Sequence, residues 1–323
     1  MTQKQLLSIV IPVHNESKNI PLIYKAIIEH TKALKYDFEI IYIDDGSRDD
    51  SAAQAYRLTD KDPNVRLLQF ARNFGKEAAV SAGLHAAKGA AAIVIDADLQ
   101  HPPELIKEFI RKWEKGAEVI VGVRNTYTQQ ESWFKKFSSK WFYRLMNGIS
   151  STKITPNATD YRLLDRTAID AFNEFTEHNR MTRGLIDWLG FKRAYIKFDI
   201  NERIHGKPTY NYKKLFQLAF NSITSHSMMP LKLAGVLGII ILLIAGPLGI
   251  FIFYQKYILN DPGGFNFTGT SALAVIVLFL VGVVLVCLGL IAMYIARIYE
   301  EVTNRPLYIV KQDTAADDEE VAA

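Results

Sequence analysis

Two acidic residues separated by one alanine carry the most specific chemistry in the sequence. Asp96 and Asp98 directly follow Ala90 to Ile95, an apolar run with the composition of a buried strand. At a strand end both carboxylates can reach one point, and such hard oxygen ligands suit Mg²⁺ or Mn²⁺, with water and the phosphates of a bound diphosphate completing the shell. The alternative is a pair of loop acids that cap the helix opening at Pro102. Their position at a strand end favours a metal site.

Polar residues also follow the three earlier apolar runs of the chain. They are His14–Glu16 after the first run, Asp44–Asp45 after the second and Arg72–Asn73 after the third. Since the carboxyl ends of parallel strands meet at one edge of a sheet, these side chains and the acid pair are expected to converge on one crevice. Acids scattered over a surface would not all fall at that edge.

Two common nucleotide-binding motifs are absent. No Gly-x-Gly-x-x-Gly follows the first run, which argues against a dinucleotide dehydrogenase, and the sequence has no Gly-x-x-x-x-Gly-Lys-Ser/Thr of a P-loop kinase or ATPase. Nucleotide recognition must then come from single side chains. Asp45 is suited to accept a hydrogen bond from a base or ribose, and Arg72 and Lys76 are suited to lie against phosphates. The alternative for Lys76 is ordinary surface charge.

The elements that must position these residues alternate between strand and helix. Continuous β-rich apolar runs predict strands that are buried on both faces of a sheet. The predicted strands are Leu6 to Val13, Phe38 to Ile43, Val65 to Phe70, Ala90 to Ile95 and Glu118 to Val121, and the predicted helices lie near Asn19 to Leu34, Asp50 to Thr59, Gly75 to Ala87 and from Pro102 onward. This order predicts a doubly wound, Rossmann-like α/β sheet with ligands beyond the carboxyl ends of its strands.

Two long stretches near the C-terminus, Leu233 to Gln255 and Pro262 to Ala296, contain no charged residue. Each is long enough to cross a bilayer, since about 20 apolar residues in a helix cover roughly 30 Å of hydrocarbon. The alternative, two buried helices of a soluble core, is disfavoured because such helices rarely run so long without a polar face. Two transmembrane helices are therefore predicted, the first kinked at Pro247.

Basic residues flank these stretches on one side. They are Lys213, Lys214 and Lys232 before the first stretch and Arg297, Arg305 and Lys311 after the second. The linker between the stretches offers Lys256 and Asp261, so the large domain and the C-terminus are predicted to be cytoplasmic. The single cysteine, Cys287, leaves no internal disulfide, and a net charge of +4 gives no argument for nucleic acid.

The chain is therefore divided into a domain over residues 1–210, an amphipathic juxtamembrane segment over 211–231, two transmembrane helices over 232–298 and a cytoplasmic tail over 299–323. Within the tail, Asp313 to Ala323 is acidic and alanine-rich and is expected to be disordered. Trp133 to Met146 and Tyr212 to Met229 mix aromatic and basic residues, which favours helices at a membrane surface over packing in the core.

Seven segments together resemble the family 2 glycosyltransferases of GT-A fold. They are Ser8 to Glu16 (SIVIPVHNE), Ile43 to Ser47 (IDDGS), Ala71 to Glu77 (ARNFGKE), Ile95 to Glu104 (IDADLQHPPE), Gly122 to Asn125 (GVRN), Asp160 to Arg166 (DYRLLDR) and Arg203 to Gly206 (RIHG). With the two C-terminal stretches, the set is similar to the polyprenyl-phosphate glycosyltransferases of GtrB and dolichol-phosphate mannose synthase type. The resemblance implies a mixed sheet and an inverting, Mg²⁺- or Mn²⁺-dependent transfer of a sugar to polyprenyl phosphate, with UDP-glucose favoured over GDP-mannose as donor.

The resemblance also implies roles for single residues. Pro12, His14, Glu16, Ile43 and Asp45 would line the donor base and ribose, Asp96, Ala97, Asp98 and Gln100 would hold the metal and diphosphate, and Arg124 and Arg203 would attract the acceptor phosphate or the donor diphosphate. The sequence departs from the family at Lys207-Pro208-Thr209, where Lys-Ser-Lys is common. Lys207 is therefore assigned by position, and the later lysine is missing.

Asp160 has two interpretations. It positions the sugar or acts as a base, or it is a structural acid paired with Arg162 or Arg166. A phosphate monoester has a second pKa near ~6 and is largely a dianion at neutral pH, so a strong base is less necessary than for a hydroxyl acceptor.

Two rival functions are less consistent with the sequence. A processive polysaccharide synthase would carry Gln-x-x-Arg-Trp ahead of a longer membrane channel, and the sequence has neither. A catalytically inactive nucleotide-sugar-binding scaffold would be expected to lose the acids Asp45, Asp96 and Asp98, all of which remain. Two membrane helices beside a heavy cytoplasmic domain also favour a homo-oligomer.

Overall fold

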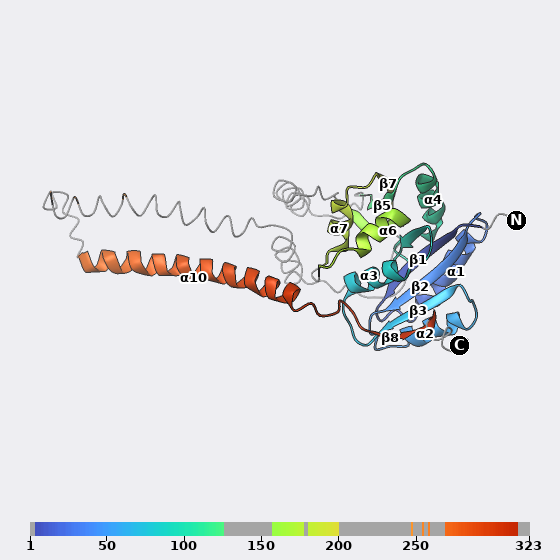
Figure 1. The fold of residues 1–323 in the computed structure, drawn as a ribbon, viewed down its shortest axis with the longest axis horizontal. Coiled ribbons are helices and arrows are strands. Elements are labelled where there is room, and N and C mark those ends of the chain that lie inside the picture. Colours follow the sequence, from blue (N-terminus) through green and yellow to red (C-terminus); the bar gives the residue numbers. More distant parts are fainter. Residues whose placement is uncertain are drawn as a thin grey trace. The chain divides into compact units, whose positions relative to one another are not determined.

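The computed structural model describes residues 4–125, 157–177, 180–199 and 269–315, together with positions 247, 254 and 258. The chain divides into two units, residues 1–209 with 305–323 and residues 210–304. In the described part of the first unit, eight strands form one sheet in the order β7-β5-β6-β4-β1-β2-β3-β8 (Figure 1). The strands are β1 Leu6–Val13, β2 Asp37–Asp44, β3 Val65–Phe70, β4 Ala91–Val94, β5 Val119–Arg124, β6 Ala158–Asp165, β7 Arg193–Phe198 and β8 Val310–Asp313.

The sheet is parallel at its centre and mixed toward both edges. Strands β3, β2, β1 and β4 are parallel neighbours, whereas β6 runs antiparallel between β4 and β5, and β7 is parallel to β5. All five predicted strands are present. The expectation of an α/β fold with a mixed sheet is confirmed, and β6, β7 and β8 are added to the predicted set.

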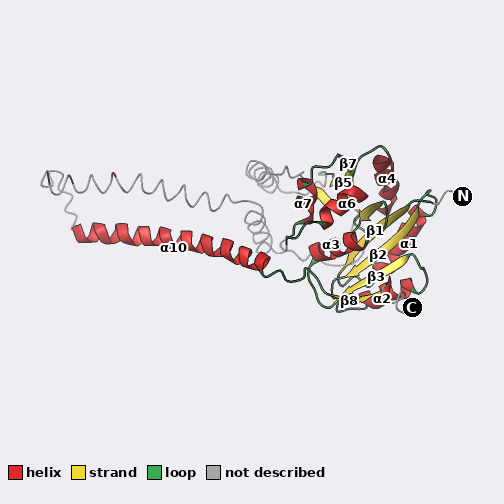
Figure 2. Cartoon of the chain, in the orientation of Figure 1, coloured by secondary structure: helices red, strands yellow, loops and turns green. Residues whose placement is uncertain are grey.

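Helices cover both faces of the sheet (Figure 2). Successive residues of the central strands point to opposite faces, and the residues on each face are apolar, so both faces must be covered. One core contains Ile9 and Ile11 of β1 and is covered by α1 Ile20–Thr31, α2 Ser51–Thr59 and α4 Ile106–Glu114. The opposite core contains Val10 of β1 and is covered by α3 Lys76–Ala86, α6 Arg166–Asn173 and α7 Thr182–Trp188. The helix predicted from Pro102 onward begins as a 3₁₀ turn, η1 Pro103–Leu105, and continues as α4.

The C-terminal segment corrects one expectation. Asp313, expected in a disordered tail, ends β8, which pairs antiparallel with β3. Its carboxylate accepts from Arg66 Nε at 2.8 Å and from Arg66 Nη2 at 2.6 Å. Just ahead of β8, the Tyr308 ring stacks on Phe70 with centroids 5.0 Å apart. The physical reason is that β3 would otherwise be an edge strand with unpaired backbone groups. Residues 316–323 lie outside the described residues.

The second unit is described mainly by α10, Gly269–Val302, a helix of 34 residues. This helix covers most of the second predicted transmembrane stretch, Pro262 to Ala296. Among the residues that the structure describes, no helix combines the length and apolarity that crossing a membrane takes. The first predicted stretch, Leu233 to Gln255, falls outside the described residues except at two positions, Pro247 and Tyr254. The two predicted interfacial helices, Trp133 to Met146 and Tyr212 to Met229, also lie outside them.

Candidate active site

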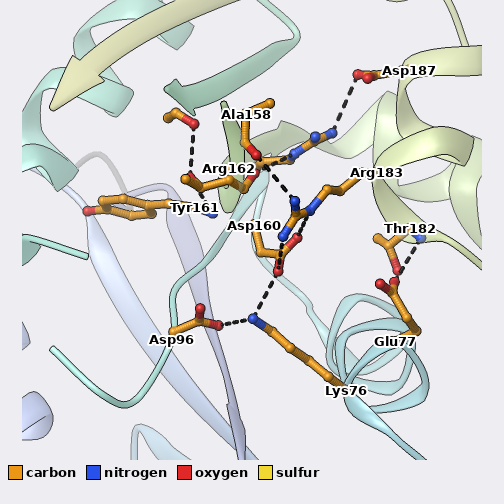
Figure 3. A network of polar contacts seen from close by, with 12 residues as sticks. Lys76, Glu77, Asp96, Ala158, Asp160, Tyr161, Arg162, Thr182, Arg183 and Asp187 are labelled. Carbon is orange, nitrogen blue, oxygen red and sulfur yellow. Dashed lines mark hydrogen bonds and ion pairs between the residues drawn. The ribbon is translucent and has the colours of Figure 1, made fainter. Parts of the chain in front are cut away.

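A lysine and two carboxylates from three different elements meet beyond the end of β4 (Figure 3). Asp96 lies in the loop after β4, Asp160 lies near the start of the neighbouring strand β6, and Lys76 is the first residue of α3. Lys76 Nζ lies 2.5 Å from Asp96 Oδ1 and 2.9 Å from Asp160 Oδ2. Of these three, only Asp96 is among the strand-end residues that were predicted to converge. Lys76 is partly exposed, but it contacts two carboxylates and is therefore not an ordinary surface charge.

Arg183, on α7, holds Asp160 from a second helix. Its Nη2 donates to Asp160 Oδ2 at 2.8 Å and its Nε donates to Asp160 Oδ1. Sequence reasoning missed Arg183, because nothing in its neighbourhood marks it and its partner lies 23 residues away. The predicted partners of Asp160 were wrong. Arg162 pairs instead with Asp187 inside the core, and Arg166 pairs with Asp170 one helical turn away.

The charges in this cluster fix one another's protonation. Burial alone raises the pKa of Asp160, but the Arg183 hydrogen bonds and the Lys76 charge lower it far below its ordinary value. Burial alone lowers the pKa of Lys76, yet the Asp96 and Asp160 carboxylates raise it above its ordinary value. Asp160 is therefore an anion and Lys76 a cation at every physiological pH. A carboxylate held in this way is a weak proton acceptor, which favours a positioning role over a base.

A buried histidine supports the loop that carries the acid pair. His101 is 2% exposed, and its ring stacks on Tyr161 with centroids 5.1 Å apart. Its Nδ1 accepts the backbone N–H of Asp96 at 3.2 Å. Burial lowers the pKa of His101, which keeps the ring neutral and Nδ1 free to accept. The matching segment IDADLQHPPE contains this histidine, but its role depends on a backbone contact that a motif does not reveal.

The carboxylate oxygens of Asp96 and Asp98 suit a divalent ion whose other ligands come from a substrate. Asp96 has a quarter of its side chain exposed, and Asp98 Oδ1 accepts from the Gln100 N–H at 3.1 Å. Ala97, between them, is buried. Within the described ranges no group of three or more His, Cys, Asp or Glu could hold a metal by itself. Mg²⁺ is commonly bound by one or two carboxylates together with substrate phosphates, and the pair suits that arrangement.

Asp45 organises the backbone where the loops after β2 and β3 meet. It is 3% exposed, and its carboxylate accepts from the Phe74 N–H at 2.6 Å and from the Gly75 N–H at 3.0 Å. Burial raises its pKa, and these two N–H groups oppose that rise. The neighbouring Gly46 has a φ of +60°, and a Cβ there would lie 2.4 Å from the Arg72 carbonyl carbon. The loops after β2 and β3 are therefore locked together, and the predicted contact of Asp45 with a base or ribose stays a prediction.

The loop after β1 joins the same group. His14 Nδ1 donates to the Asp45 carbonyl oxygen at 2.9 Å, and its Nε2 accepts from Asn15 Nδ2 at 3.0 Å. The ring and amide of this exposed pair are thus oriented before any ligand binds. Glu16 Oε2 accepts from Asn19 Nδ2 at 2.5 Å, next to the start of α1.

The remaining predicted residues are less close to this arrangement. Pro12 and Ile43 pair across β1 and β2, and both are buried, so the structure places the Ile43 side chain in the core beneath α3 and not on a binding surface. Arg72 is exposed and lies over the Phe74 ring at 4.6 Å from its centroid. Arg124 is exposed at the end of β5. Arg203 and Lys207 lie outside the described residues.

Comparisons with known proteins point to one family. The model of the family described as "Glycosyl transferase family 2" matches residues 8–172. The chain is 37% identical over 306 residues to a protein of Shigella phage SfII named bactoprenol glucosyl transferase, covering 95% of this chain and 97% of that one. It is 41% identical over 305 residues to the uncharacterized glycosyltransferase YkcC of Bacillus subtilis, covering 94% of this chain and 93% of that one.

Among solved structures, glucosyl-3-phosphoglycerate synthase from Mycobacterium tuberculosis in complex with Mn²⁺, uridine diphosphate and phosphoglyceric acid aligns with 68% of this chain and 76% of its own. The TM-score is 0.48 and the identity 18%.

Proposed function

The chain belongs to glycosyl transferase family 2, and on that basis we propose that it transfers a sugar from a nucleotide-sugar donor to the phosphate of a polyprenol. The observation that carries the proposal is the cluster of Asp96, Lys76, Asp160 and Arg183 beyond the end of β4. The acceptor is inferred from relatives that are named for glucosyl transfer to bactoprenol and that match 95% of the chain.

The donor is proposed to be UDP-glucose, with GDP-mannose as the alternative. Asp96 and Asp98 would hold Mg²⁺ or Mn²⁺ together with the donor diphosphate. When bound, the ion supplies positive charge that stabilises the departing nucleotide diphosphate. Arg72 and Lys76 would add positive charge next to the same phosphates. His14, Glu16 and Asp45 would define the base and ribose side.

The chain's own residues would contribute position and charge to an inverting displacement. The acceptor phosphate is a dianion at neutral pH and attacks the anomeric carbon without first losing a proton. Asp160 then serves as the fixed anion against which Lys76 is oriented. Arg124, together with Arg203 and Lys207, would attract the acceptor phosphate to the site. The positioning role of Asp160 is supported by its contacts, because Arg183 donates a hydrogen bond to each of its two carboxylate oxygens.

The enzyme is further proposed to be an integral membrane protein with a cytoplasmic catalytic domain, active as a homo-oligomer and without a nucleic-acid partner. The support is the two charge-free stretches and the basic residues that flank them. Topology can be measured in a Cys287→Ser background with single cysteines introduced as Asn260→Cys or Lys18→Cys. A membrane-impermeant maleimide should label position 260 on intact cells and position 18 only after the cells are opened. Equal labelling of both positions would contradict the proposed orientation.

The activity is tested with purified full-length protein in detergent. Polyprenyl phosphate is mixed with UDP-glucose or GDP-mannose and with Mg²⁺ or Mn²⁺, and both the glycolipid and the released nucleotide are measured. Nucleotide release that requires polyprenyl phosphate and is lost in Asp98→Asn supports the proposal. Donor binding without any transfer would point to the inactive scaffold, and undiminished transfer by Asp98→Asn would remove the metal from the mechanism. Lys107→Met, on the exposed side of α4, is the control for general effects of charge.

A further inference from the structure

Lys76 occupies the same carboxylate that the proposed metal needs. Its ammonium lies 2.5 Å from Asp96 Oδ1, and the Asp96 side chain is only one quarter exposed. A divalent ion on either oxygen of Asp96 would lie beside this ammonium, and the two cations would repel each other strongly in a partly buried site. Lysine and metal are therefore competitors for one anion.

The same lysine has a second anchor to which it can withdraw. Asp160 Oδ2 lies 2.9 Å from Lys76 Nζ, and the bidentate contact with Arg183 keeps Asp160 in place whether or not Lys76 is bound to it. The next residue of α3, Glu77, accepts the backbone N–H of Thr182 at 2.8 Å, so α3 is also tied to the start of α7. Lys76 can therefore exchange one partner without any movement of the helices around it.

We propose that Lys76 is a built-in counter-ion of Asp96 that makes metal binding depend on the donor diphosphate. This inference rests on the proposed function, because it needs a metal–diphosphate donor. A metal ion that binds alone must displace the Lys76 ammonium from Asp96, and it brings no new anion for that ammonium to contact. A nucleoside diphosphate brings new negative charge for Lys76 to contact as the metal takes Asp96, so the two ligands bind together better than either binds alone.

The coupling between the two ligands is reciprocal, which gives the test its readout. Mn²⁺ binding to the full-length protein in detergent is measured by the loss of the free-ion signal in electron paramagnetic resonance, with and without UDP, after subtraction of the loss that UDP causes in the absence of protein. In the wild-type protein UDP should tighten Mn²⁺ binding by about 5- to 150-fold, the usual range of coupling between two sites. Lys76→Met should tighten Mn²⁺ binding in the absence of UDP and should reduce the gain that UDP brings.

Loss of one positive charge could tighten metal binding without any competition, and two controls separate the effects. Lys107→Met removes a charge from the exposed side of α4 and should change nothing. Asp160→Asn removes the second anchor, so Lys76 should hold Asp96 more firmly and Mn²⁺ should bind more weakly. In the double variant with Lys76→Met this weakening should disappear if it acts through the lysine. If it persists at full size, a general charge effect is responsible and the proposal is overturned.

The remaining outcomes separate this inference from the proposed function. Unchanged or weaker Mn²⁺ binding by Lys76→Met, with transfer by the wild-type protein intact, overturns the competition but leaves the enzyme assignment in place. A wild-type protein that binds no Mn²⁺ even with UDP overturns both the competition and the metal-dependent mechanism. Thermal unfolding of each variant checks that it is folded, and Lys76→Gln provides a second substitution that keeps a polar side chain at this position.

Discussion

Arg183 donates to both oxygens of Asp160, and one of those oxygens also lies within 2.9 Å of Lys76 Nζ. Three elements, β6, α3 and α7, are thereby joined at a single carboxylate. This arrangement suits an acid that positions cations and does not favour one that acts as a general base. Asp160 contacts two cations, Arg183 and Lys76, whereas the proposed phosphate acceptor would supply its own negative charge to the reaction.

Replacement of Asp160 by asparagine is expected to leave measurable transfer. General base catalysis contributes about 10²- to 10⁴-fold, so loss of a true base would lower kcat by at least that range. We expect a smaller loss of kcat, below ~100-fold, together with a higher KM for the donor, because Lys76 loses one of its anchors. Steady-state kinetics at saturating polyprenyl phosphate gives both values. A loss of kcat beyond ~10³-fold without a change in donor KM would restore Asp160 as the base.

Arg183 is expected to influence the acid stability of the first unit, residues 1–209 with 305–323. The pKa of Asp160 in the folded protein lies far below the value of about 3.9 that an unfolded aspartate has. Its contribution to stability is therefore present above that unfolded value and is lost as the pH falls below it. In Arg183→Met the folded pKa rises, so the loss of unfolding free energy between about pH 5 and pH 2 should be smaller than in the wild type. Urea unfolding across this range measures it, with Arg111→Met on the exposed face of α4 as the matched control.

His101 is expected to act through the acid pair and not on the substrate. His101→Phe keeps an aromatic ring against Tyr161 but leaves the Asp96 N–H without the acceptor that it has in the structure. An unsatisfied buried donor costs about 1–3 kcal/mol, and we expect the unfolding free energy to fall by that amount. The affinity for Mn²⁺ with UDP should fall as well, because the loop loses its support. His101→Asn, which can accept the same hydrogen bond, should recover part of the metal affinity.

Gly46 is expected to tolerate no side chain. A Cβ at this position would meet the backbone of Arg72 and Asn73 at 2.4 and 2.5 Å, in addition to the strain of a φ of +60°. Gly190 is a matched control, since its φ is +75° and its nearest neighbour, the Trp188 carbonyl oxygen, is 3.9 Å from a built Cβ. Gly190→Ala should cost about 1–2 kcal/mol from backbone strain alone. Gly46→Ala should lower both the unfolding free energy and the donor affinity by more, and equal losses for the two variants would contradict the close contact.

The pair of Arg66 and Asp313 is expected to stabilise the attachment of β8. Each side chain is only about one fifth exposed, and the contact uses two hydrogen bonds. A double-mutant cycle with Arg66→Met and Asp313→Asn should give a coupling above the ~0.2–1 kcal/mol of exposed pairs. Deletion of residues 307–323 should also expose the edge of β3 and promote aggregation, which light scattering measures. A coupling near zero would show that backbone pairing alone holds β8.

The parallel centre of the sheet could be predicted because its strands are continuous apolar runs. Leu6 to Val13 and Ala90 to Ile95 stand out as strands that are covered on both faces. The polar residues that follow them mark the edge of the sheet where ligands are predicted to bind. The antiparallel strand β6 was not predicted, although the motif Asp160 to Arg166 overlaps most of it. It lies between β4 and β5, and no local pattern indicates that a later strand inserts there.

The contacts that define the site join residues that are far apart in the sequence, so local sequence patterns do not reveal them. Arg183 reaches Asp160 across 23 residues of sequence, and nothing in the residues around Arg183 distinguishes it from a surface arginine. Asp313 belongs to an acidic tail by composition, yet it is paired with a residue 247 positions earlier. Composition describes the average solvation of a segment. It does not show that a single acid in that segment has a partly buried cationic partner elsewhere.

The return of the chain through β8 gives the first unit two covalent connections to the segment 210–304. A protease that cuts once within that segment would leave both fragments associated, because the C-terminal fragment remains hydrogen-bonded to β3. Tension applied to α10 would likewise reach the sheet through a strand whose hydrogen bonds must shear or unzip. The pairing of β8 with β3 thus holds the end of the chain to the rest of the first unit. If β8 detached from β3, residues 1–209 would remain connected to the segment 210–304 only at residue 209.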